Sequence, residues 1–120
     1  MAKILVAEDE RMMLKSLSFK LSKEGHEVDT AENGRDAWEL IQRTKYDLVL
    51  ADIIMPYVTG MELLERIKNN PATKDIKVVM LSALGQEDTV LQAFEIGADD
   101  FMTKPFSPNE LLVRIRKLTK

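Results

Sequence analysis

The 120-residue chain predicts one α/β domain in which a parallel sheet is covered by helices on both faces. Three observations indicate this fold class. Five short apolar runs of strand type alternate with five segments of helical periodicity. One run, residues 48–51, is apolar throughout, as in a strand buried on both faces. Strict alternation of strand and helix implies right-handed crossovers, which place helices on both sides of the sheet.

The expected strands are short and end at polar residues. They cover residues 3–7, 26–30, 48–51, 76–81 and 99–103. The second is more polar than the others, which suits the edge of a sheet. The third ends at Asp52, and a loop from Pro56 to Gly60 follows it. In open α/β sheets, ligands bind at the carboxyl ends of the strands, so we expect Asp52 to lie at a functional edge.

Each expected helix combines an apolar stripe with a start or stop signal. The helices cover residues 11–24, 34–41, 59–70, 87–96 and 107–118. Leucines line one face of the first, which ends at Gly25. Asn33 precedes the second, and Gly97 ends the fourth. The third and fifth open at Thr59 and Ser107, each three residues before a glutamate, in the pattern of a capping box.

The composition excludes several classes of protein. A net charge of −3 is unsuited to nucleic-acid binding by charge. The absence of cysteine removes disulfide and thiolate chemistry and fits a reducing cytosol. No apolar run approaches the length of a membrane span, and the first ten residues do not form a signal peptide. We therefore expect a cytoplasmic protein with a single domain at 1–120 and no membrane contact.

Unusual polar residues recur at the ends of four of the five strands. They are Glu8 and Asp9 after the first, Asp52 at the end of the third, Ser82 after the fourth and Lys104 after the fifth. In a parallel sheet these strand ends share one edge, so the side chains should meet. The second strand contributes no such residue. That fits the strand order 2-1-3-4-5, in which the four contributing strands are neighbours.

Three carboxylates in one cleft repel one another and raise one another's pKa values. A hard divalent cation such as Mg²⁺ resolves this repulsion, because it prefers oxygen ligands and keeps several waters. Carboxylates, a metal ion, a lysine and a hydroxyl form an apparatus for phosphoryl transfer. We expect Asp52 to be the nucleophile, since aspartyl phosphates are established covalent intermediates. Ser82 is placed to donate to a phosphoryl oxygen.

The chain resembles the receiver domain of two-component response regulators over its whole length. The resemblance is carried by Glu8-Asp9, Asp52 with Met55-Pro56 and Gly60, Ser82-Ala83, residues 97–101 (GADDF) and Lys104-Pro105-Phe106. It implies a doubly wound (βα)5 flavodoxin-like fold of three layers. It also implies that Asp52 accepts a phosphoryl group from a histidine kinase or a histidine phosphotransfer protein.

The same resemblance implies roles for the other site residues. Asp9 and Asp52 would ligate Mg²⁺, or Mn²⁺ as a substitute, together with the main-chain carbonyl of Ile54, while Glu8 acts through water. Lys104 would contact the phosphoryl group and precede a cis bond to Pro105. Ser82 and Phe101 would move when Asp52 is phosphorylated. The face of the fourth helix, fifth strand and fifth helix would then bind a downstream effector or a fused output domain.

Several positions depart from the usual pattern of the family. Phe101 replaces the commoner tyrosine and lacks its hydroxyl. Ile54 is apolar where polar residues are frequent, so we expect it to hinder attacking water and to prolong the life of the phosphoform. Gln92 stands where regulators with a winged-helix output carry a basic residue in their dimer contact. We therefore expect a monomer or a weak dimer that depends on phosphorylation.

Two other classes of function stay open on the sequence alone. A phosphatase or mutase of the aspartyl-phosphate kind would carry a second acid two residues after the nucleophile, where this chain has Ile54. A flavin or nucleotide carrier on a similar sheet would need a phosphate-binding loop after the first strand, where this chain is acidic. We expect no enzymatic turnover beyond the protein's own phosphorylation and dephosphorylation. Met12 and Met13, near the acidic site, are candidate contacts for a phosphodonor.

Overall fold

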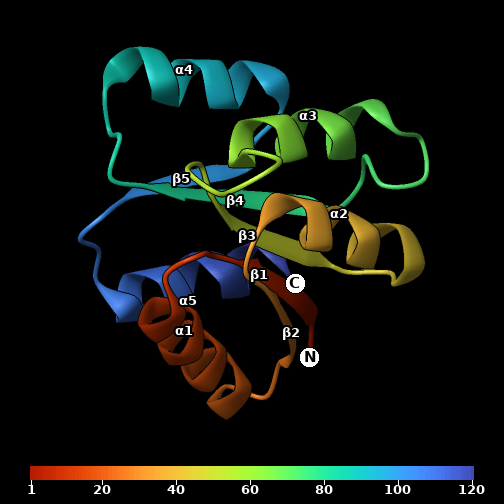
Figure 1. Ribbon diagram of the computed structural model, residues 1–120. Helices are drawn as coiled ribbons and strands as arrows, with labels where there is room; N and C mark the ends of the chain where they lie inside the picture. The colour runs from red at the N-terminus through yellow and green to blue at the C-terminus, as the bar shows by residue number, and fades with distance from the viewer.

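A five-stranded parallel sheet forms the centre of the protein in a computed structural model that describes residues 1–120 (Figure 1). The strand order is β2-β1-β3-β4-β5, as predicted. The strands are β1 (Lys3–Ala7), β2 (Glu27–Ala31), β3 (Leu48–Asp52), β4 (Lys77–Ser82) and β5 (Asp100–Thr103). The helices are α1 (Arg11–Lys23), α2 (Gly34–Arg43), α3 (Gly60–Asn69), α4 (Glu87–Ile96) and α5 (Pro108–Leu118). The doubly wound three-layer fold is therefore confirmed.

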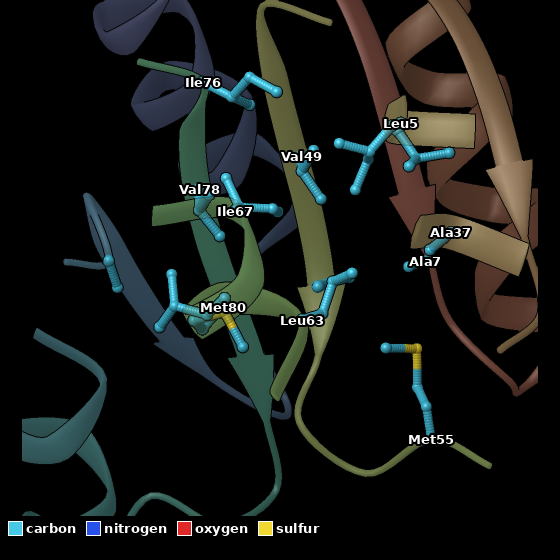
Figure 2. Packing of buried hydrophobic residues seen from close by; sticks show 14 of the residues in the cluster. Leu5, Ala7, Ala37, Val49, Met55, Leu63, Ile67, Ile76, Val78 and Met80 are labelled. Atoms are coloured by element: carbon cyan, nitrogen blue, oxygen red, sulfur yellow. The ribbon is translucent and has the colours of Figure 1, made fainter. Parts of the chain in front are cut away.

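The helices divide between the two faces of the sheet. Helices α1 and α5 cover one face, and α2, α3 and α4 cover the other (Figure 1). Alternate strand residues enter two separate cores, because successive side chains of a strand point to opposite faces. Figure 2 shows Val49, Val78 and Met80 of the strands beside Leu63 and Ile67 of α3. Burial on both faces explains why β3 is apolar throughout.

Some predicted boundaries differ from the structure by one or two residues. Strand β2 begins at Glu27 rather than His26, because the His26 N–H donates to the Leu21 carbonyl at the end of α1. Strand β4 extends through Ser82, whose register partner in β5 is Thr103. These shifts follow hydrogen bonds between distant segments, which an apolar run in the sequence does not specify.

Two glycines let helices approach the loop that follows β3. A Cβ at Gly60 would collide with the backbone carbonyl of Asp52, and one at Gly34 with that of Val58. The Gly60 N–H donates to the Ile53 carbonyl at 2.8 Å, so the start of α3 is tied to the end of β3. The first turns of α2 and α3 therefore fix the loop beside Asp52.

None of the helices combines the length and the apolar character that crossing a membrane requires.

Candidate functional site

The carboxyl ends of β1, β3, β4 and β5 bring the predicted polar residues to one edge of the sheet. Asp52 is the last residue of β3 and Ser82 the last of β4, while Lys104 directly follows β5. Glu8 and Asp9 follow β1. The side chains converge because the parallel strands end at the same level of the sheet: Ala7 pairs with Ala51, and Asp52 pairs with Leu81.

Lys104 joins two carboxylates that lie 44 positions apart in the sequence. Its Nζ donates to Asp52 Oδ2 at 2.7 Å and to Glu8 Oε1 at 2.8 Å. The other oxygen of each acid is also held. Asp52 Oδ1 accepts from the Ile54 N–H at 3.1 Å, and Glu8 Oε2 from the Glu10 N–H at 3.1 Å. Both carboxylates therefore have fixed orientations.

Burial and charge act in opposite directions on these groups. Burial raises the pKa of the Glu8 carboxyl, and the hydrogen bond from Lys104 offsets this only in part. Burial alone would lower the pKa of Lys104, but hydrogen bonds and charge from Asp52 and Glu8 outweigh it and raise the pKa. Lys104 is consequently a firmly protonated ammonium at neutral pH.

The third acid, Asp9, completes a compact acidic cluster with Glu8 and Asp52. Carboxylate oxygens of the three residues lie within 4.8 Å of one another. Glu8 and Asp52 are buried, whereas Asp9 is exposed and takes part in no ion pair. One ammonium faces three carboxylates, so this donor set suits a hard divalent cation with oxygen ligands. Ile54 lies beside the cluster with a side chain that is 54% exposed.

Of the predicted switch residues, Ser82 ends β4, Phe101 lies on β5 and Pro105 follows Lys104. Ser82 is buried, and its Oγ accepts from the Leu84 N–H at 2.8 Å, while its carbonyl accepts from the Lys104 N–H. The peptide bond between Lys104 and Pro105 is cis, as expected. Phe101 is already buried between the sheet and α4. The resemblance implies that this ring moves inward after phosphorylation, and the movement itself stays a prediction.

The sequence did not predict that Tyr57 and Arg35 lie together near the site. Tyr57, in the loop after β3, has a φ of 69° and is 70% exposed. The guanidinium of Arg35, in the first turn of α2, lies 4.3 Å from the centre of its ring. Positive φ is rare for an aromatic residue, so a residue type alone does not predict it.

A hollow on the surface lies at the opposite end of the sheet. It is lined by residues that include Tyr46, Asn70 and Lys120, and none of the predicted site residues borders it. The candidate site is a cluster of acidic side chains defined by its hydrogen bonds with Lys104.

The sequence matches the family model described as "Response regulator receiver domain" over residues 4–116. The chain belongs to this family. Receiver domains are signalling switches of two-component systems and not enzymes that turn over free substrates. The family assignment therefore argues against both the phosphatase and the flavin-carrier alternatives.

Receiver relatives match the chain from end to end. The phosphate regulon transcriptional regulatory protein PhoB of Pseudomonas aeruginosa is 40% identical over 117 residues, which cover 98% of this chain and 51% of that protein. The chain spans about half the length of the curated relatives it matches. The solved receiver domain of Francisella response regulator 1452 superposes with a TM-score of 0.93 at 32% identity, over 99% of this chain and 97% of that one.

A second similar structure is a receiver domain that is described as activated. The BeF3-activated DrrB receiver domain matches with a TM-score of 0.88 at 35% identity, over 98% of this chain and 97% of that one. This receiver fold therefore occurs in a relative described as activated by a fluoroberyllate.

Proposed function

We propose that Asp52 of this receiver accepts a phosphoryl group from a phosphorylated histidine of a protein donor. The observation that carries the proposal is the pairing of Lys104 with Asp52 at 2.7 Å, beside two further carboxylates. A structural ion pair alone would not require Asp9, which is exposed and in no ion pair but belongs to the same cluster of carboxylates. The match of residues 4–116 to the family supports reading 1–120 as one receiver domain in the cytoplasm.

The nucleophile in this proposal is a carboxylate oxygen of Asp52. It attacks phosphorus, the bond from phosphorus to the donor nitrogen breaks, and the freed imidazole takes up a proton. The hydrogen bonds from Lys104 and the Ile54 N–H hold the carboxylate in one orientation. After transfer, the Lys104 ammonium is placed to stabilise the negative charge of the phosphoryl oxygens.

The acidic cluster would hold Mg²⁺, or Mn²⁺ in its place. Asp9, Asp52 and the main-chain carbonyl of Ile54 would be the protein ligands, with Glu8 acting through water. The bound cation would neutralise charge on the phosphoryl group and on the carboxylates. Glu8 already shares Lys104 with Asp52 and is buried, which supports its indirect role.

The output of the switch would be the face formed by α4, β5 and α5. Phosphorylation adds negative charge and acceptor oxygens at Asp52, toward which Lys104 and the Ser82 hydroxyl rearrange. The loop after β4 would follow Ser82, and Phe101 of β5 and Pro105 border the same surface hollow as Glu110 and Arg114 of α5. A downstream effector, or an output domain fused to the receiver, would bind there without direct contact of this domain with nucleic acid. A pull-down with and without beryllofluoride tests this, and partners that bind equally in both arms would contradict it.

Labelling by acetyl phosphate tests the acceptor directly. Wild-type protein should gain one phosphoryl group by intact mass in the presence of Mg²⁺ and none in EDTA. Asp52→Asn should abolish the gain, while Asp75→Asn, which removes an exposed aspartate far from the site, should not. Labelling that survives in Asp52→Asn would contradict the assignment of the acceptor.

A further inference from the structure

Tyr57 is a large exposed side chain held in an unfavourable backbone conformation. It is the only residue other than glycine with a positive φ, at 69°, and it is 70% exposed. Its loop is pinned on both sides, because the Gly34 N–H donates to the Pro56 carbonyl and the Gly60 N–H to the Ile53 carbonyl. Strain of this kind in an aromatic residue persists where the surrounding structure enforces it, and it concentrates at functional sites.

Arg35 gives the Tyr57 ring a defined orientation. Its guanidinium lies 4.3 Å from the ring centre, and its nearest carboxylate is Asp36 at 3.7 Å. The guanidinium covers one side of the ring. Both residues are exposed, so the fold buries neither side chain. The pair presents an apolar ring beside a cation, a combination common at binding surfaces.

Tyr57 lies in the loop that directly follows Asp52, and Arg35 lies in the first turn of α2, whose Gly34 N–H donates to the Pro56 carbonyl of that loop. The Ile54 N–H donates to Asp52, and Tyr57 follows three residues later. Asp52 is only 6% exposed, so a protein that presents phosphohistidine to it must also contact the surrounding loops. Around Asp52, Asp9 and Glu10 are exposed acids, whereas Arg35 offers an exposed cation that a carboxylate of the donor can approach.

We propose that Tyr57 and Arg35 form a docking contact that selects the protein phosphodonor. The donor places an apolar side chain against Tyr57 and a carboxylate against Arg35. This inference rests on the proposed function, because it assumes phosphoryl transfer to Asp52. A small donor such as acetyl phosphate has no protein surface to place against this stack, so it gains nothing from the contact.

The test compares a protein donor with a small donor on the same variants. The protein donors are the histidine kinases of the source organism, autophosphorylated with ATP, of which the one that transfers fastest to wild type is used. Tyr57→Asn removes the ring and keeps a residue that tolerates positive φ, and Arg35→Ala removes the cation. Tyr57→Phe keeps the ring, and Arg43→Ala removes an exposed arginine at the far end of α2.

We expect Tyr57→Asn and Arg35→Ala each to lower kcat/KM with the kinase by about tenfold, mainly through KM. Tyr57→Phe and Arg43→Ala should stay near wild type, and acetyl phosphate should label all five proteins at similar rates. Equal kinase rates in all variants would overturn the docking contact, as would equal losses with both donors. Labelling by acetyl phosphate without transfer from any kinase would overturn it too, whereas a wild type that neither donor labels would refute the proposed function itself.

Discussion

At the scale of single residues, the site depends on a few side chains with several partners each. Lys104 contacts both Glu8 and Asp52, and each acid also accepts a backbone N–H. Removal of Lys104 would leave two buried carboxylates without a cation, which is unfavourable for folding and, under the proposed function, for phosphoryl transfer. Residue type and position at strand ends were sufficient to predict this group, because parallel strands end at one edge.

Other residue-scale features could not be predicted from the sequence. The φ of Tyr57 is enforced by the backbone of its neighbours and not by its own preference. Lys68 donates to the carbonyls of Lys74 and Ile76 and to Asp99, although its position on α3 reads as an ordinary exposed lysine. Such contacts join segments that are distant in the sequence, and only the folded structure shows that these segments are close together.

His26 should make stability depend on pH. Burial, and then the positive N-terminal group, lower its pKa, and its Nδ1 accepts the Ala2 N–H at 3.3 Å. A depressed pKa means that the stabilisation is present above the unfolded value of 6.5 and is lost as pH falls through the folded value. Urea unfolding between about pH 7 and 5 should show a larger loss of free energy in wild type than in His26→Asn. Parallel pH profiles for the two proteins would rule this out.

Ile54 should control the lifetime of the phosphoform. Its apolar side chain is exposed and its N–H donates to Asp52, so under the proposed function the side chain would hinder the approach of an attacking water. Ile54→Asn should shorten the half-life of phosphorylated protein by about fivefold, equivalent to about 1 kcal/mol of barrier. The measurement follows loss of the phosphoryl group after removal of acetyl phosphate, with Ile54→Val as the control. A longer half-life in Ile54→Asn would count against this role.

At the scale of elements, the order and type of every helix and strand followed from apolar runs, periodicity and caps. Strand β3 was the clearest because it is buried on both faces, and α5 because Ser107 and Pro108 mark its start. Several ends of elements differ from the predicted ones by one or two residues. The predicted start of β2 at His26 was wrong, because the His26 N–H closes the turn after α1 and the pairing with β1 begins at Glu27.

The capping box of α3 should stabilise the fold measurably. The Glu62 N–H donates to Thr59 Oγ1, and the Thr59 N–H donates to Glu62 Oε1 at 3.0 Å. Thr59→Ala should lower the free energy of unfolding by about 1 kcal/mol. Thr89→Ala, inside α4 where the hydroxyl makes no hydrogen bond, should be neutral or slightly stabilising. Equal urea midpoints for Thr59→Ala and wild type would contradict a stabilising cap.

At the scale of the whole molecule, binding of a divalent ion should stabilise the fold. An ion that binds the folded state alone adds about 2.7 kcal/mol at a concentration one hundred times its Kd. Thermal melts in MgCl2 should therefore lie above melts in EDTA for wild type. Asp9→Asn should remove most of this shift, while Asp75→Asn should keep it. A shift of the same size in all three proteins would show that the ion binds elsewhere.

The last helix runs back along the sheet, which has a practical consequence for labelling. Lys120 and Thr119 border the same hollow as Tyr46 and Lys77, at the amino ends of β3 and β4. Asp52 lies at the carboxyl end of β3, across the full height of the sheet. A fluorophore or surface tether attached after Lys120 therefore leaves the acceptor edge free, and it can report on binding there without obstructing it.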